Sequence, residues 1–396
     1  MTLRLLLPIA LALLALTAAC GAAPFYHAEP IFPAEHFHNH ASCLVELPNG
    51  DLLACWYRGV GPEKGDDVRI YGARRLKGAR AWSPRFVLAD TPGYPDDNPC
   101  LFVDPQQRLW LLWPTLVGNE WHTALMKYRI SSNYQMRQGP PVWSWQDVIH
   151  VTPANFQQDV EQAISQTLAA HPDLGERLKA LYGDELGLVR QRATSKVSYR
   201  LGWMTRAHPT LLPSGRLLVP LYTDGFSVSI IAITDDLGRT WKTSRVIAGE
   251  GGIQPSVVRK QDGTLVAMMR TAGPHRRILL SHSRDEGMTW SPVTVSDLPN
   301  PGSGLEVIRI ANGHWVLVYN DREQGREDLA VSISDDEGQT WKWTRHLEKG
   351  SNGSYPSIIQ TRDGMLHATY SHSVGAQTIK YAAFNEEWVR QGDPKE

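Results

Sequence analysis

Cysteine is scarce in this chain of 396 residues, which has only four, and no CxxC or HExxH spacing occurs. The missing spacings give no sign of a metal site, and we expect no cofactor. Charge of one sign is also lacking, because the net charge is −1 and there is no basic run or glycine-rich phosphate loop. These absences argue against nucleic acid as a partner.

Long hydrophobic runs are absent except at the N-terminus, where residues 5–16 are apolar. This run follows a short basic start, precedes small residues and is too short to span a bilayer stably. The pattern predicts a secretory signal over residues 1–20 and export to the periplasm or cell envelope. Cys20 follows two alanines as in a bacterial lipobox, although Thr17 stands where an apolar residue is usual. We favour a lipid at Cys20, the expected link to a membrane, over simple cleavage.

What the chain does contain is a short motif repeated three times in its second half. The copies span residues 234–241, 283–290 and 334–341 and share the pattern Ser/Thr-x-Asp-x-Gly-x-Thr-Trp. Each copy follows a strand-like apolar stretch, and the aspartates recur about every 50 residues, which is typical of a repeat architecture. The aspartate can bond backbone N–H groups of its own turn, the glycine accepts a positive φ, and the tryptophan can pack against the next strand. We interpret each copy as a hairpin corner, not a metal or catalytic site.

The motif resembles the Asp-box, or BNR repeat, of sialidases and their relatives. That resemblance implies an all-β, six-bladed β-propeller, and six hairpin-like segments of the chain agree with this number. They cover residues 44–55, 101–113, 209–221, 255–268, 306–318 and 356–369. We assign residues 21–396 to the propeller domain. Cys43 and Cys55 fall in neighbouring predicted strands, where they either form a disulfide in an oxidising compartment or stay buried thiols.

Residues 153–200 lack strand patterning and predict a helical insertion between blades 2 and 3. Phe156 and Val160 begin a row of apolar residues spaced by four, as on one face of a helix. Asn155 with Gln158 three residues later resembles a capping box at the start of that helix. The insertion is either a packing appendage or a wall of the substrate cleft.

The resemblance to sialidases also implies catalytic positions. In that family a tyrosine activated by a glutamate is the nucleophile, three arginines hold the substrate carboxylate, and a loop aspartate is the acid. By position within the blades, Tyr355 matches the tyrosine, while Arg270 and Arg326 match two arginines. A neutral phenol suits an anionic substrate, which would repel a carboxylate nucleophile. His40 replaces the first arginine and Gln254 replaces the glutamate, and a glutamine cannot act as a base.

The acid is expected to be Asp66 or Asp67, with Glu63 nearby as a third choice, and His40 is a candidate for the missing base. Other polar residues lie at blade ends that should face the channel mouth and bind substrate. They include Arg58, Asn98, Arg206, His208 and Asp321. The set predicts an acidic glycan as partner and an exo-α-sialidase-like glycoside hydrolase as function. A lyase or other glycosidase acting on uronate-containing glycans and a non-catalytic glycan-binding propeller are the alternatives.

Overall fold

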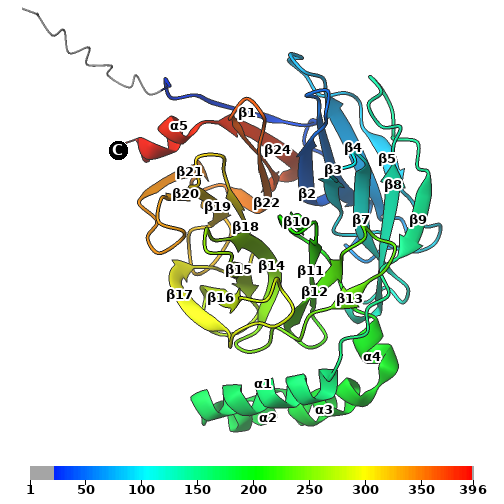
Figure 1. The fold of residues 1–396 in the computed structure, drawn as a ribbon, viewed down its shortest axis with the longest axis vertical. Helices are drawn as coiled ribbons and strands as arrows, with labels where there is room; N and C mark the ends of the chain where they lie inside the picture. Colours follow the sequence, from blue (N-terminus) through cyan, green and yellow to red (C-terminus); the bar gives the residue numbers. More distant parts are fainter. Residues whose placement is uncertain (1–21, 395–396) are drawn as a thin grey trace, which may run out of the picture.

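The computed structural model describes residues 22–394 and contains six four-stranded antiparallel sheets arranged as blades around a common centre (Figure 1). The predicted six-bladed β-propeller is therefore confirmed. The predicted signal segment, residues 1–20 with Cys20, lies outside the described residues. No helix in the described part of the chain is long and apolar enough to cross a membrane.

The first five blades follow one another along the chain, and each runs from an inner to an outer strand. Their strands are β2 (His38–Glu46), β3 (Leu52–Gly59), β4 (Arg69–Arg75) and β5 (Phe86–Ala89) in blade 1; β6 (Cys100–Val103), β7 (Leu109–Leu116), β8 (Ala124–Ser131) and β9 (Trp145–Val148) in blade 2; β10 (Thr210–Leu211), β11 (Leu217–Thr223), β12 (Val228–Thr234) and β13 (Lys242–Thr243) in blade 3; β14 (Gly252–Arg259), β15 (Leu265–Thr271), β16 (Arg277–Ser283) and β17 (Thr294–Pro299) in blade 4; β18 (Glu306–Arg309), β19 (Trp315–Asn320), β20 (Leu329–Ser334) and β21 (Trp343–Glu348) in blade 5. Strands β7 and β12 are buried along their whole length because neighbouring blades cover both faces, so their sequences are mostly apolar and do not alternate with exposed polar residues.

Blade 6 joins the two ends of the described chain. It contains β22 (Asn352–Gln360), β23 (Leu366–Val374), β24 (Ala376–Phe384) and, as its outer strand, β1 (Tyr26–Pro30) from the N-terminal side. Helix α5 (Glu386–Arg390) follows, and its Trp388 stacks on Tyr26 with ring centroids 4.4 Å apart. The sequence did not predict β1, which covers the edge that β24 would otherwise expose.

The helical insertion between blades 2 and 3 is confirmed. Helices α1 (Phe156–Ala170), α2 (Leu174–Tyr182), α3 (Glu185–Thr194) and α4 (Lys196–Arg200) lie outside the ring (Figure 1). A short 3₁₀ turn, η1 (Trp121–Thr123), precedes β8. Phe156 fixes the start of α1 by packing edge-on against Phe226, with centroids 4.8 Å apart. The predicted capping box is wrong, since Asn155 adopts a left-handed φ of 57° and its side chain accepts no cap hydrogen bond.

The repeated motifs form the predicted turns, each between the third and fourth strands of its blade. The Asp236 carboxylate accepts hydrogen bonds from the Thr240 backbone N–H at 2.9 Å and the Thr240 hydroxyl at 2.7 Å. Asp285 and Asp336 make the same bonds within their own turns. The motif glycines have φ of 93°, 87° and 81°, as a left-handed turn position requires. The Asp-boxes are therefore corners of the scaffold.

Candidate functional site

Four non-glycine residues with left-handed backbones lie where inner strands reach one end of the channel. Ala41, Asn98, Gln254 and Tyr355 have φ of 52°, 38°, 53° and 54°. The pairing register of β2, β14 and β22 shifts at these points. Such conformations cost about 1–3 kcal/mol each and concentrate at functional sites. We call this end, where the strained residues gather, the channel mouth.

Tyr355 is the centre of the polar cluster at the mouth and is 8% exposed. Its hydroxyl oxygen accepts a hydrogen bond from Arg270 Nη1 at 2.6 Å and one from Gln254 Nε2 at 3.3 Å. Gln254 Nε2 also donates to the Tyr222 hydroxyl at 3.1 Å. Arg270 reaches Tyr355 because it lies near the end of β15, opposite Ile253 on β14, next to the strained position of Gln254.

Three further side chains surround the Tyr355 ring. The guanidinium carbons of Arg206 and Arg326 each lie 5.2 Å from the ring centroid, and the His40 ring lies 4.3 Å away. Arg206 is buried and donates to the Ser42 and Pro356 carbonyl oxygens at 3.2 and 2.7 Å, so it ties inner strands together. Arg326 donates to the Gly302 carbonyl at 3.4 Å and stays partly exposed. Arg326 is thus better placed than Arg206 to meet an anionic ligand.

His40 does not supply the charge of the arginine it replaces. Burial, with a smaller contribution from the positive charge of Arg326, lowers the pKa of His40 to about 3 against the opposing effect of Glu63. The imidazole is therefore neutral at physiological pH, and its low pKa makes it a weak base. The positive charge at the mouth comes from the arginines alone.

Glu63, which lies near His40, and Asp97, which interacts with Glu63, have pKa values shifted in opposite directions. Interaction with His38 is the largest influence on Glu63, which also accepts a hydrogen bond from the Tyr57 hydroxyl at 3.2 Å, and its pKa falls to about 2. Burial raises the pKa of Asp97 well above its usual value, and the negative charges of Glu63 and Asp96 add to this shift. Neither Asp97 oxygen has a hydrogen-bond partner among the described residues. Glu63 is therefore a carboxylate, whereas Asp97 holds its proton more tightly than an ordinary aspartate does.

A sequence family described as a BNR repeat-like domain matches residues 50–167 and 190–368. The chain belongs to this family. The gap between the two matched ranges, residues 168–189, falls within the helical insertion.

Known relatives of this BNR repeat-like chain include sialidases. The chain is 26% identical over 180 residues to an anhydrosialidase from Macrobdella decora, a match that covers 40% of this chain and 23% of the relative's length. The structure resembles a protein of unknown function from Dyadobacter fermentans DSM 18053, with a TM-score of 0.67, 15% identity, and 90% and 97% of the two chains covered. It also resembles a leech intramolecular trans-sialidase complexed with 2,7-anhydro-Neu5Ac, with a TM-score of 0.67, 14% identity, and 92% and 71% covered. At these identities the structural similarity establishes the shared fold.

The two aspartates predicted as the acid lie apart from the Tyr355 cluster. Asp66 is exposed and accepts a hydrogen bond from Asn119 Nδ2 at 2.6 Å. The Asp67 carboxylate accepts a hydrogen bond from the Val60 backbone N–H and so fixes its own loop. No hydrogen bond joins either carboxylate to Tyr355, Arg270 or His40 in the described structure, and the catalytic role of both stays a prediction.

The other predicted binding residues divide between the mouth and other places. Asn98 belongs to the mouth, because its Nδ2 donates to the Tyr222 hydroxyl at 3.3 Å. Arg58 is already paired with Glu35 at 2.7 Å and stacks on Phe37 with its Cζ 3.7 Å from the ring centroid. Asp321 accepts a hydrogen bond from the Tyr319 hydroxyl at 3.2 Å, within blade 5. Neither Arg58 nor Asp321 joins the group around Tyr355.

His208 lies deeper in the channel of the BNR repeat-like fold. Its Nδ1 is 2.8 Å from Glu306 Oε1, and its Nε2 is 3.2 Å from Cys43 Sγ. Cys43 pairs in register with Cys55, yet the described cysteines are all buried free thiols, and Cys43 Sγ is 3.8 Å from Cys100 Sγ. The thiol alternative therefore holds for Cys43 and Cys55. Because its ring nitrogens contact Glu306 and Cys43 inside the fold, His208 belongs to the channel lining.

Sequence reasoning missed Tyr57, Asp97 and Tyr222 at the mouth. Tyr57 and Tyr222 lie near the ends of second strands, the same kind of position that Arg270 occupies in blade 4. Asp97 immediately precedes Asn98, which carries one of the strained backbones. Position relative to the blade register was therefore the signal that could have identified all three.

A cavity of about 170 Å³ lies beside the cluster, and His38, His40, Glu63, Arg326, Ser354 and His372 are among its lining residues. A larger hollow of about 990 Å³ is lined by Asn49, Lys77 and Arg362, from the turns at the other end of blades 1 and 6. The lining of the larger hollow includes neither Tyr355 nor the side chains that contact it. The smaller cavity therefore marks the candidate site.

Proposed function

We propose that this chain is a sialidase-type glycoside hydrolase that acts on a glycan carrying a carboxylated sugar. The observation that carries the proposal is the 2.6 Å hydrogen bond from Arg270 Nη1 to the Tyr355 hydroxyl oxygen, with Arg326 at the same ring. A guanidinium so placed can bind a carboxylate and stabilise negative charge on the phenol oxygen during reaction. The sialidase relatives and the fold they share support the same class of substrate.

In this proposal the Tyr355 oxygen bonds to the anomeric carbon while the bond from that carbon to the leaving glycosidic oxygen breaks, and the phenol proton passes to water. A second water molecule later attacks the same carbon and releases the sugar from the tyrosine. The approach of an anionic sugar favours a neutral phenol over a carboxylate as nucleophile. Arg270 and Arg326 hold the sugar carboxylate, and neutral His40 contributes packing or a hydrogen bond in place of a third cation. Asn98 and Gln254 support the hydroxyl groups of Tyr222 and Tyr355.

We assign the acid role to Asp97 in preference to Asp66 and Asp67. A general acid must hold its proton near neutral pH until the leaving oxygen takes it, and the raised pKa of Asp97 favours the protonated form. Neither Asp97 oxygen has a hydrogen-bond partner in the described structure, and the residue is fully buried beside Asn98. Asp66 and Asp67 are instead engaged with Asn119 and Val60.

One observation favours a second function, the binding of the sugar without turnover. Gln254 occupies the place of the base that should take the Tyr355 proton, and its Nε2 donates to the Tyr355 oxygen. Its Oε1 is buried with no hydrogen-bond partner in the described structure. Gln254→Glu tests this point, because a restored base contributes about 10²–10⁴-fold to a proton-transfer step. We expect the variant to release sugar from a sialoside at least about tenfold faster than the wild type, whereas an unchanged rate would contradict a limiting role for Gln254.

The deciding experiment is product analysis on a panel of sialosides and uronate-containing glycans. The proposed hydrolase releases N-acetylneuraminate from a sialoside, and Tyr355→Phe loses this activity. Mass spectrometry distinguishes that product from its 2,7-anhydro form, and ultraviolet absorbance detects the unsaturated product of a lyase. If calorimetry detects binding of N-acetylneuraminate but no sialoside is hydrolysed, the binding function is supported and the hydrolase function is not. Absence of both binding and turnover for every carboxylated sugar would overturn the proposal.

A further inference from the structure

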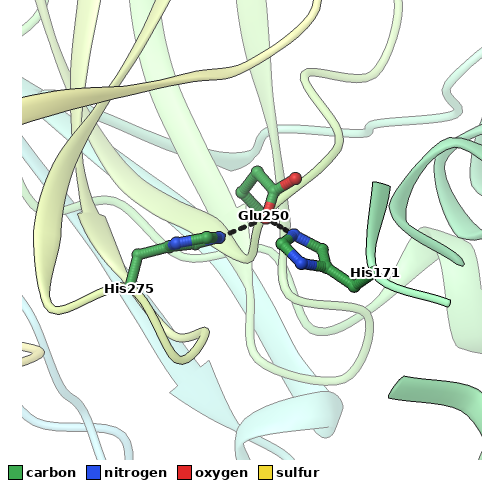
Figure 2. A group of neighbouring side chains, drawn as sticks. All are labelled: His171, Glu250 and His275. Atoms are coloured by element: carbon green, nitrogen blue, oxygen red, sulfur yellow. Dashed lines mark hydrogen bonds and ion pairs between the residues drawn. The ribbon is translucent and has the colours of Figure 1, made fainter. Parts of the chain in front are cut away.

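Three potential metal ligands from distant parts of the chain meet beside blade 4. His171 follows α1 in the helical insertion, Glu250 precedes β14, and His275 lies between β15 and β16 (Figure 2). Glu250 Oε2 is 3.3 Å from His171 Nε2 and 2.6 Å from His275 Nε2. One ligand atom from each residue lies within 4.8 Å of the other two. Both imidazoles therefore present Nε2 to the same carboxylate oxygen.

The backbone holds Glu250 and His275 in place. Glu250 has a left-handed φ of 53°, and Gly251 and Gly273 bring the two loops into close contact. A Cβ at Gly273 would lie 2.6 Å from the Glu250 carbonyl oxygen, and one at Gly251 would lie 2.8 Å from the Gly273 backbone nitrogen. Only glycines allow this approach, so the loops that carry Glu250 and His275 are held in position before any ion binds.

We propose that His171, Glu250 and His275 bind a divalent transition metal ion of the zinc type. Two imidazole nitrogens and one carboxylate oxygen form a ligand set that suits zinc, whereas calcium and magnesium prefer oxygen ligands alone. Tetrahedral zinc with bonds of about 2.0–2.2 Å places neighbouring ligand atoms about 3.3–3.5 Å apart. The His171 to Glu250 distance already has this value, and the 2.6 Å distance between Glu250 and His275 would have to lengthen by less than about 1 Å.

The fourth position of this site faces solvent. The side chains of His171, Glu250 and His275 are 36%, 16% and 23% exposed, so the cluster lies at the surface of the interface between insertion and blade. Three protein ligands with one open position leave room for a water molecule on the ion. This arrangement lets the ion enter without unfolding the insertion.

The ion would tie the helical insertion to the loops that continue into the channel mouth. Glu250 lies four residues before Gln254, and His275 lies five residues after Arg270. Residues Gly252 and Thr271 pair between these points, so the metal site and the mouth belong to the same end of blade 4. The insertion is therefore fixed next to the site, which favours its role as a cleft wall over that of a remote appendage. The metal proposal does not depend on the sugar chemistry.

A second anchor of the insertion provides a matched control. Asp159 on α1 accepts hydrogen bonds from Arg245 Nε at 2.9 Å and from the Val246 backbone N–H at 3.3 Å. This ion pair contains no histidine and does not take part in the cluster. Asp159→Asn should loosen the insertion and leave metal binding intact. His150→Ala removes an exposed histidine close to the insertion and controls for surface binding.

The test uses the whole tag-free chain, dialysed against zinc chloride and analysed for bound zinc by mass spectrometry. We expect one equivalent in the wild type, in His150→Ala and in Asp159→Asn. His171→Ala, Glu250→Gln and His275→Ala should each weaken binding at least about 100-fold, and circular dichroism checks that they fold. Zinc should slow proteolytic cleavage of residues 171–200 in the wild type and in Asp159→Asn, but not in His171→Ala. Zinc bound equally by the three ligand variants, or not bound by the wild type, would overturn the proposal and leave a hydrogen-bonded cluster.

Discussion

The two ends of the propeller use the same residue types for different purposes. At the Asp-box end, Asp336 receives hydrogen bonds from Thr340 and Ser334, and the left-handed Glu337 completes a turn. At the channel mouth, the left-handed Gln254 and Tyr355 are joined by a hydrogen bond between their side chains, and Asp97 has no hydrogen-bond partner among the described residues. A buried polar group without a partner is costly and so is retained where a ligand can satisfy it. The hydrogen-bonded Asp-box carboxylates hold the fold, and the mouth, with its strained backbones and unpartnered Asp97, is the candidate site.

The largest expected effect is at Tyr355. Tyr355→Phe removes the oxygen that Arg270 contacts, and sialoside turnover should fall by at least about 10³-fold because loss of a nucleophile removes the main reaction path. Initial rates with a fluorogenic sialoside measure this. Tyr222→Phe is the matched control, because Gln254 donates to the Tyr222 hydroxyl as it does to that of Tyr355, and this variant should retain most of the turnover. Equal losses in the two variants would assign Tyr355 a packing role.

A second experiment compares two arginines. Arg270→Lys removes the guanidinium fork from the Tyr355 oxygen and should lower kcat/KM about 10²-fold, as expected for a charged contact worth about 2–3 kcal/mol. Arg58→Lys is the control, because Arg58 is occupied by Glu35 and should leave kcat/KM within about twofold of the wild type. Steady-state kinetics measures kcat/KM of both variants. A comparable loss of kcat/KM in Arg58→Lys would mean that the active site extends beyond the Tyr355 cluster.

Substitution of Asp97 is expected to lower the activity and to raise the stability of the protein. The acid must be protonated, so turnover should fall as the pH rises through the raised pKa of Asp97, and Asp97→Asn should be less active and lack this alkaline limb. A raised folded-state pKa also means that ionisation destabilises the fold above the usual aspartate pKa. Asp97→Asn should therefore unfold at higher urea concentration than the wild type at pH 8, with a smaller difference at pH 4. A variant that is less stable at pH 8 would contradict the unpaired state of Asp97.

The smallest effect on activity is expected at the Asp-boxes. Asp336→Asn should destabilise the fold by about 1–2 kcal/mol through weakened hydrogen bonds, while kcat stays unchanged. The Thr340 hydroxyl and backbone N–H lower the Asp336 pKa to about 2, so its ionic contribution is present above the usual aspartate pKa and is lost as the pH falls towards 2. Urea unfolding of variant and wild type at pH 6 and pH 2.5 should show the difference shrinking with acid. A fall in kcat of Asp336→Asn at pH 6 would contradict this prediction and would mean that the Asp-box affects catalysis at the opposite end of the propeller.

The sequence predicted the parts of the molecule that depend on local patterns. The Asp-boxes and the apolar row from Phe156 specified the corners and the insertion because turns and helices are encoded by nearby residues. The burial of Asp97 and the pairing of Arg58 with Glu35 could not be predicted, since both arise only when distant loops pack.

The candidate metal ligands left no spacing signal either. They lie 79 and 25 residues apart along the chain, and only the folded blade and insertion bring them together. The expectation that the chain has no metal site rested on short motifs, which detect ligands carried by one local segment.

The outer strand of blade 6 has a consequence for the order of folding. Residues 26–30 pair with residues 380–384, so the N-terminal strand has no partner until nearly the whole chain is available. Loops of this length close slowly relative to local hairpins, because the chain entropy is lost before the contacts form. The first five blades can each form from contiguous sequence, whereas closure of the ring is the last step. A chain interrupted before β24 would keep its first strand unpaired and exposed to association with other chains.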